Sequence, residues 1–210
     1  MFDNLDTYAE FISDDENPIL KELTRKTNLN ILMPRMLSGN IQGQFLEFIS
    51  KVIKPVNILE LGTFTGYSTI CLSKGLVDNG KITTIEINDE LEPVIKEFFE
   101  KANILNKVQL IFGDALQIIP TLKQEYDLVF IDADKRCYLN YYKLVFEKLK
   151  KGGIIIADNI FWSGKVIEEV EKNDFYTKGI LEFNDFVKHD KRVEKLALPL
   201  RDGLFLIRKK

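Results

Sequence analysis

The sequence predicts an α/β fold, with one mostly parallel seven-stranded sheet and helices on both of its faces. Short apolar runs alternate with helical patterns from Asn57 onwards, which is typical of βαβ units. The chain of 210 residues is long enough for one hydrophobic core, and its 29% of charged residues is ordinary for a globular domain. The last two apolar runs flank residues 201–203, which predicts an antiparallel hairpin at one edge of the sheet.

Two helices are predicted before the first strand. Asn17 can cap a helix over residues 16–28, and Pro18 suits its first position. Apolar residues recur at helical spacing over residues 43–53, and the stretch 31–40 between the two helices contains helix breakers and is predicted to be a loop. The later strands are predicted at residues 57–61, 81–87, 108–113, 127–132 and 153–158, and the later helices at residues 66–74, 89–102, 115–122, 138–149 and 177–188.

Composition disfavours several kinds of site. His189 is the only histidine, which argues against zinc sites and against Ser-His or Cys-His catalysis. The net charge of -3 provides no overall attraction for nucleic acid, and no run of about eighteen apolar residues could span a membrane. The N-terminus is acidic where a signal peptide would be basic, and the two cysteines, Cys71 and Cys137, fit a reducing compartment. We therefore predict a cytoplasmic protein without a membrane segment.

The first predicted strand leads into a glycine turn that favours a nucleoside ligand without phosphates. Gly62 and Gly66 follow this strand, and Glu86 ends the second strand, where an acidic residue can bind ribose hydroxyls. The spacing is G-x-x-x-G, and Phe64 stands where a dinucleotide site needs a second glycine. Glu60 would repel a pyrophosphate but could face a cationic or amino-bearing ligand. This turn resembles the S-adenosylmethionine site of Rossmann-like methyltransferases.

Two strand ends carry residues that suit a metal ion. The fourth predicted strand ends in Asp132, and the fifth ends in Asp158, which Asn159 follows. If these strands are neighbours, they lie about 5 Å apart and both carboxylates can reach one cation. Two carboxylates and an amide suit a hard ion, Mg²⁺ first, with Mn²⁺ or Ca²⁺ as possible substitutes.

Two more polar residues follow the fourth strand. Asp134 is predicted to accept a hydrogen bond from the cofactor or to cap the next helix, rather than to bind metal. Lys135 would lie beside the ion, where its charged form is disfavoured, so that its pKa falls and it can act as a general base. The alternative for Lys135 is a solvated surface lysine.

Six motifs along the chain carry a resemblance to a known family. They are LELGTFTGYST, TIEIND, FGDAL, FIDADKRCYLNYY, IIADNIFWSG and LPLRDGLFLIRK. Together they resemble the metal-dependent O-methyltransferases of the caffeoyl-CoA and catechol O-methyltransferase family, over nearly the whole chain. The resemblance implies a Rossmann-like methyltransferase fold in a single domain 1–210, in which N-terminal helices within 1–55 cover the site of a core within 56–210. It also implies S-adenosylmethionine and a divalent cation as cofactors, and a homodimer.

The resemblance implies a role for each site residue. Lys135 would be the general base. The metal ligands, which also count as catalytic, would be Asp132, Asp158 and Asn159. The residues that bind the methyl donor would be Ser38, Glu60, Gly62, Thr63, Tyr67, Ser68, Glu86, Ala115, Asp132 and Asp134.

The implied acceptor is a small aromatic molecule with two neighbouring hydroxyls. A metal chelated by both oxygens would lower their pKa, Lys135 would remove a proton, and the oxyanion would attack the methyl group. The acceptor pocket is expected between the N-terminal segment, residues 161–163 and a loop at 171–179. Ser163 stands where plant members have asparagine, so caffeoyl-CoA itself is not implied as the acceptor.

Three alternatives stay open. A tRNA hydroxyuridine O-methyltransferase of the same family would need a basic surface beside the pocket. The candidates for that surface are Lys135, Arg136, Lys165 and Arg201. An NAD-dependent oxidoreductase is opposed by Phe64 and Glu60, which do not suit a pyrophosphate. A protein that binds the donor without turnover is opposed by the complete set of metal and base residues.

Overall fold

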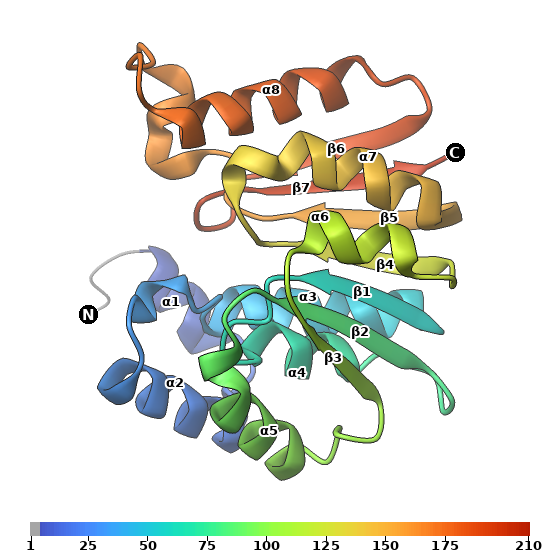
Figure 1. The fold of residues 1–210 in the computed structure, drawn as a ribbon. Helices are drawn as coiled ribbons and strands as arrows, with labels where there is room; N and C mark the ends of the chain where they lie inside the picture. The colour runs from blue at the N-terminus through green and yellow to red at the C-terminus, as the bar shows by residue number, and fades with distance from the viewer. Residues whose placement is uncertain (1–4) are drawn as a thin grey trace.

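The computed structural model consists of one sheet between two groups of helices (Figure 1). It describes residues 5–210. The strands are β1 (Asn57–Leu61), β2 (Lys81–Glu86), β3 (Val108–Phe112), β4 (Tyr126–Ile131), β5 (Leu149–Ala157), β6 (Val193–Leu198) and β7 (Leu204–Lys209). Within the described residues they form a seven-stranded sheet in the order β3-β2-β1-β4-β5-β7-β6. Strands β1 to β5 are parallel, and β7 pairs antiparallel with β5 and β6, which confirms the predicted sheet and hairpin.

The helices cover the sheet on both faces, as predicted. They are α1 (Leu5–Ile12), α2 (Pro18–Asn30), α3 (Asn40–Ile53), α4 (Tyr67–Ser73), α5 (Glu92–Lys101), α6 (Ala115–Ile118), α7 (Tyr138–Lys148) and α8 (Phe175–His189). Short 3-10 turns lie at Pro34–Met36, Asp89–Leu91, Ile119–Thr121, Lys135–Cys137 and Trp162–Ile167. In the part of the chain that the structure describes, no helix is long and apolar enough to cross a membrane.

Alternate side chains of the strands pack into two cores, one on each face of the sheet. In β1, Leu59 and Leu61 belong to the core that α6, α7 and α8 cover, whereas Ile58 belongs to the core under α2, α3, α4 and α5. All three side chains are fully buried. Burial of each stabilises the fold by about 2 kcal/mol, so the near-continuous apolar character of these strands follows from burial on both faces.

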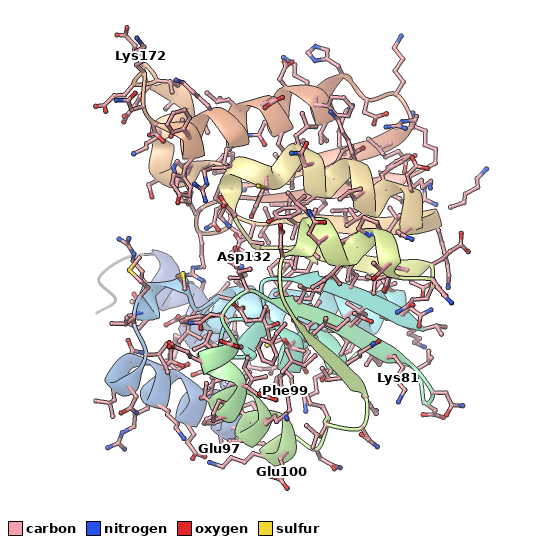
Figure 2. The ribbon with its side chains drawn as sticks, viewed as in Figure 1. Lys81, Glu97, Phe99, Glu100, Asp132 and Lys172 are labelled. Carbon is pink, nitrogen blue, oxygen red and sulfur yellow. The ribbon has the colours of Figure 1, made fainter. Side chains whose placement is uncertain are left out.

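The register of the central strands aligns their carboxyl ends. Leu61 of β1 pairs with Ile131 of β4, and Ile131 pairs with Ala157 of β5. The residues after these positions therefore leave the sheet side by side, at the point where strand order reverses between β1 and β4 and where open α/β sheets bind ligands. In Figure 2, Asp132 lies at the carboxyl ends of the parallel strands, and Lys81, the first residue of β2, lies at their opposite ends.

Some elements differ from their predicted bounds. The helix predicted at 115–122 stops at Ile118 and continues as a 3-10 turn, because Pro120 cannot donate the next helical hydrogen bond. Helix α8 begins at Phe175, because the Asp174 carboxylate accepts a hydrogen bond from the N–H of Thr177 at 3.0 Å. The second half of the loop expected at 171–179 is therefore helical. Helix α1 was not predicted.

Candidate active site

The turn after β1 is shaped by two glycines with left-handed backbones. Gly62 has φ of 95°, and a Cβ there would overlap the main-chain oxygen of Asp132. Gly66 has φ of 92° at the N-cap of α4, and a Cβ there would overlap the ring of Phe99. Glycine at position 62 lets the turn pack against the end of β4, and glycine at position 66 lets the start of α4 pack against α5, so the turn owes both residues to the fold as well as to any ligand.

Glu60 is a fully buried carboxylate at the end of β1. The hydroxyls of Thr69 and Thr84 both donate to its Oε2, and the distance from the Thr84 hydroxyl is 2.6 Å. The Thr63 hydroxyl extends this network, because it lies 2.6 Å from the Thr84 hydroxyl. Among the described residues, no hydrogen bond reaches Glu60 Oε1. Burial raises the pKa of Glu60 to about 7, although the hydroxyls of Thr69, Thr84 and Ser68 act in the opposite direction. A cationic ligand group would satisfy both the free oxygen and the charge.

Glu86 ends β2 and points its carboxylate at the same turn. Oε2 accepts the N–H of Phe64 at 2.7 Å, and Oε1 accepts the N–H of Asn88 at 3.0 Å. Phe64 adopts a left-handed φ of 49° to present that N–H. Each carboxylate oxygen retains a second lone pair, so Glu86 is held in place while it can still accept hydroxyl donors.

Asp132 and Asp158 lie side by side after β4 and β5, as the sequence predicted. The N–H of Asp132 donates to Leu61 O at 2.9 Å, and the N–H of Asp158 donates to Ile131 O at 3.0 Å, so each continues the sheet by one residue. The Asp158 side chain is 4% exposed. Burial first, and then the charge of Asp132, raise the pKa of Asp158. Within residues 5–210, no group of three or more His, Cys, Asp or Glu side chains is arranged to hold a metal ion; the predicted set has two carboxylates and an amide.

Lys135 is 7% exposed, so the alternative of a solvated surface lysine is wrong. Its Nζ donates to Asp132 Oδ1 at 2.6 Å and to the hydroxyl of Tyr138 at 2.7 Å. Asp134 caps the 3-10 turn that begins with Lys135, because its carboxylate accepts the N–H of Arg136 at 3.0 Å. The same carboxylate forms an ion pair with the Arg136 guanidinium, which lowers the pKa of Asp134. The capping alternative for Asp134 is therefore present in the structure.

Residues from distant parts of the chain complete the surroundings of Asp158 and Asn159. Gln42 of α3, 1% exposed, donates to Asp158 Oδ2 at 2.5 Å. Asn159 has a left-handed φ of 56°, and its amide nitrogen lies 3.4 Å from Asp202 Oδ2. Asp202 also accepts the N–H of Ser163 at 2.5 Å. Sequence reasoning missed Gln42 and Asp202, and the one signal for Gln42 was a polar residue at the start of an apolar helix.

The remaining predicted donor residues are spread around the same edge of the sheet. Ser38 and Ser68 are buried, in the loop before α3 and at the start of α4 respectively. Ala115 is buried as the first residue of α6, after β3. Tyr67 is 2% exposed, and its hydroxyl donates to Glu16 Oε1 at 2.6 Å, so this side chain joins α4 to the segment between α1 and α2.

Aromatic residues follow Asn159 and contact the start of α8. The rings of Trp162 and Tyr176 are stacked with centroids 5.9 Å apart and an interplanar angle of 14°. The Arg136 guanidinium lies over the Tyr176 ring, 5.0 Å from its centroid. Phe161 and Trp162 are partly buried against the core under α7 and α8, so part of their role is packing. Tyr176 was not singled out from the sequence, because it lies in the segment expected to be a loop.

Similarity to known proteins agrees with this arrangement. A family model described as O-methyltransferase matches residues 10–210. Caffeoyl-CoA O-methyltransferase 2 of Petunia hybrida is 35% identical over 201 residues, covering 90% of this chain and 81% of the plant protein. Caffeoyl-CoA O-methyltransferase 1 of Eucalyptus globulus is 36% identical over 200 residues, covering 90% of this chain and 80% of its own.

Solved structures show the same fold with a nucleoside product bound. An O-methyltransferase from Bacillus cereus in complex with SAH has a TM-score of 0.90 and 30% identity, covering 98% of this chain and 97% of that one. An SAH-bound methyltransferase from Podospora anserina has a TM-score of 0.89 and 29% identity, and the match covers 98% of this chain and 94% of that one. These matches decide against the oxidoreductase alternative. The chain belongs to the O-methyltransferase family, among the S-adenosylmethionine-dependent enzymes that include the caffeoyl-CoA O-methyltransferases.

Proposed function

We propose that this enzyme transfers the methyl group of S-adenosylmethionine to one hydroxyl of a small aromatic acceptor with two vicinal hydroxyls, with the help of a divalent cation. The observation that carries the proposal is the pair of carboxylates at neighbouring strand ends, Asp132 and Asp158, beside the buried amine of Lys135. The plant relatives are caffeoyl-CoA O-methyltransferases, which supports an aromatic acceptor.

The residues at the ends of β1 and β2 suit the donor. S-adenosylmethionine supplies an electrophilic methyl group on a sulfonium, together with an α-amino group and ribose hydroxyls. Glu60 has a buried oxygen without a partner among the described residues, which fits a cationic or amino group. Glu86 can accept the ribose hydroxyls while two backbone N–H groups hold its carboxylate. We assign the other donor contacts to Ser38, Gly62, Thr63, Tyr67, Ser68, Ala115, Asp132 and Asp134.

The residues at the ends of β4 and β5 suit a hard divalent cation. Asp132 and Asp158 are close enough that the charge of the first raises the pKa of the second, so a cation bound between them would favour the charged form of Asp158. Asn159 would supply an amide oxygen to the same ion. When bound, Mg²⁺, or Mn²⁺ or Ca²⁺ in its place, lowers the pKa of a coordinated hydroxyl.

The chain's own groups position the acceptor and move its proton. Lys135 takes the proton of the acceptor hydroxyl at Nζ. The acceptor oxygen then forms its bond to the methyl carbon as the bond from that carbon to sulfur breaks, and the electron pair stays on sulfur. The enzyme accelerates this step largely by holding oxygen and carbon in line, at near-contact distance.

The N-terminal helices take part in the site, which supports the prediction that residues 1–55 cover a core in 56–210 within one methyltransferase domain. Gln42 reaches Asp158 from α3. Arg201, in the hairpin turn, donates to Leu37 O at 3.0 Å, next to the predicted donor residue Ser38. The first and last segments of the chain thus meet beside the site.

A tRNA acceptor is less well supported. Three of the four basic residues that could attract RNA are already neutralised by carboxylates: Lys135 by Asp132, Arg136 by Asp134, and Lys165 by Asp174 at 3.1 Å. Arg201 is the member of this set with no carboxylate partner among the described residues. Salt-dependent RNA binding needs several free cations on one surface.

The decisive experiment mixes the purified protein with S-adenosylmethionine and either a panel of vicinal diphenols or bulk tRNA, in the presence of Mg²⁺ or EDTA. We expect a gain of one methyl group by mass on a diphenol, abolished by EDTA and by Asp158→Ala. Methylation of tRNA alone would replace the proposed acceptor. Methylation of a diphenol that persists in EDTA would remove the cation from the mechanism.

A homodimer is proposed from the family resemblance, and the surface supplies a place for it. Phe48 and Val52 of α3 are 69% and 64% exposed, and Ile49 on the same helix lines an apolar groove. The other apolar residues that line this groove are Ile154, Leu196, Leu206 and Ile207. We expect light scattering to give a dimer that Phe48→Glu dissociates, while Leu29→Glu, at an exposed position on α2, leaves it intact. A monomeric wild-type protein would contradict this.

The cytoplasmic location stays a prediction from composition. Cell fractionation with an antibody against the protein tests it directly, and recovery from the membrane or the medium would overturn it.

A further inference from the structure

Tyr138 is a buried residue outside the predicted set that touches both halves of the metal and base cluster. It is fully buried as the first residue of α7, three residues after Lys135. Its hydroxyl accepts a hydrogen bond from Lys135 Nζ at 2.7 Å. The main-chain oxygens of Ile131 and Asp158 lie 3.2 and 3.1 Å from the same hydroxyl and receive its single proton. Its ring also lies under the amine, with Nζ 4.8 Å from the centroid.

The two hydrogen bonds of the Lys135 amine fix the direction of its lone pair. Nζ has two partners among the described residues, Asp132 Oδ1 at 2.6 Å and the Tyr138 hydroxyl at 2.7 Å. An amine that is ready to take a proton has two N–H bonds and one lone pair, arranged tetrahedrally. If both N–H bonds point to these oxygens, the lone pair has one orientation left. A lysine held only by Asp132 could rotate about that single contact.

The Tyr138 hydroxyl is itself held in place. It lies between the main-chain oxygen of Asp158, after β5, and that of Ile131, the last residue of β4. Because its one proton is directed at these main-chain oxygens, the hydroxyl accepts from the lysine amine through a lone pair. The ring is locked by an edge-on contact with Phe183, at a centroid distance of 5.5 Å.

We propose that Tyr138 is a positioning residue: its hydroxyl orients the Lys135 amine so that the lone pair faces the acceptor hydroxyl. The proposal rests on the proposed function, in which Lys135 is the base. It assigns the residue no contact with substrate. Its effect is expected in the transfer step rather than in the binding of donor or cation, because within residues 5–210 the hydroxyl bonds to the lysine amine and to two main-chain oxygens.

The first test replaces the hydroxyl alone. Tyr138→Phe is expected to lower the single-turnover rate of methyl transfer to 1,2-dihydroxybenzene by about 10- to 100-fold, the range expected when a catalytic group is slightly misplaced. The KM for the diphenol, the affinity for SAH and the affinity for Mn²⁺, measured by calorimetry, are expected to stay within about twofold. The matched control is Tyr142→Phe, one turn along α7, which is equally buried and loses a 2.9 Å hydrogen bond to Asp190. This control is expected to keep the wild-type rate.

The second test asks whether Tyr138 acts through Lys135. In a Lys135→Met background, Tyr138→Phe is expected to cause no further loss of rate, because there is no amine left to orient. Equal losses in both backgrounds, or loss of Mn²⁺ or SAH binding in Tyr138→Phe, would overturn the proposal in favour of a structural role at the end of β5. Thermal unfolding of the same four proteins tests the contact without turnover, and additive changes in stability would also overturn it.

These outcomes separate the two proposals. If Lys135→Met keeps the wild-type rate, the base in the proposed function is wrong, and the positioning role of Tyr138 is overturned with it. If Lys135→Met is inactive while Tyr138→Phe keeps the wild-type rate, the proposed base stands and only the inference about Tyr138 fails.

Discussion

Two buried carboxylates at opposite sides of the site, Glu60 and Asp158, have different neighbours. Glu60 is surrounded by neutral donors, the hydroxyls of Thr69 and Thr84. Asp158 lies beside a second carboxylate and an ion-paired lysine, and accepts the amide of Gln42. Burial raises the pKa of each above its usual value. In both halves of the site the charged form of a carboxylate is therefore disfavoured, and a cationic group beside it would favour that form.

The comparison separates two ways of making a site for a cation. The half with Glu60 is built locally, from β1, the following turn and β2, and it needs one positive group of the donor. The half with Asp158 draws on α3, β4, β5 and the hairpin, and it already contains one positive group, Lys135. We expect substitutions in the first half to change donor affinity and those in the second to change the transfer rate.

The largest expected effect comes from Asp158→Ala. Removal of one of two carboxylates should reduce methyl transfer by about a thousandfold or more, because in the proposed mechanism both cation binding and the position of the acceptor depend on it. SAH affinity, measured by calorimetry, should change by less than about threefold. A parallel loss of SAH affinity would show that the two halves are not independent.

The next largest effect is expected in the free energy of unfolding of the variant Glu60→Gln. The folded-state pKa of Glu60, about 7, lies above its ordinary value of 4.5, so the folded protein binds this proton more tightly than the unfolded chain. Stability therefore decreases as the pH rises from 4.5 to about 7. At pH 8, Glu60→Gln should raise the free energy of unfolding of the ligand-free protein by up to about 3 kcal/mol.

Urea denaturation at pH 8 and pH 4.5 measures this effect. The difference between wild type and Glu60→Gln should nearly vanish at the lower pH, where Glu60 is protonated in the folded protein and only partly ionised in the unfolded chain. A variant that is less stable at both pH values would show that the hydrogen bonds from Thr69 and Thr84 outweigh the burial of charge.

In Glu60→Gln, the affinity for the donor is expected to fall while the stability of the ligand-free protein rises. Loss of a charge-assisted contact to the donor should weaken SAH binding by about 10- to 100-fold at pH 8. Wild-type affinity should fall as the pH decreases through about 7, because protonated Glu60 no longer offers a negative charge. The affinity of Glu60→Gln should be flat over this range, and calorimetric titrations from pH 6 to 8 check both curves.

The smallest effect is expected from Gln42→Ala. Its amide holds Asp158 without touching a reactant, so Mn²⁺ affinity should fall by about tenfold while SAH affinity is kept. The control is Gln44→Ala, two residues along α3, whose side chain bonds to Asn40 and to Asp14 O at the surface. A loss of SAH affinity in Gln42→Ala alone would mean that α3 serves the donor half of the site.

Much of the fold could be predicted from local patterns. The strands up to β5 and the C-terminal hairpin were predicted from apolar runs and turn residues, because burial on both faces and turn chemistry depend on near neighbours. The patterns define no separate helix at α1, and they extend the helix at 115–122 past Pro120, where the structure has a 3-10 turn instead. The predicted carboxylate pair was confirmed as a pair of neighbours by the β4–β5 register.

The sequence by itself determined the strand ends, the glycine turn, the two aspartates and the lysine that follows them, since each belongs to a short contiguous motif. Only the tertiary structure decided that Glu60 is buried without an ion-pair partner among the described residues, and that Gln42 meets Asp158 across 116 residues of chain. It also decided that Asp202 of the hairpin lies beside Asn159. The physical reason is that burial and long-range hydrogen bonds arise from how layers pack, and side chains far apart in sequence leave no local pattern that predicts their contact.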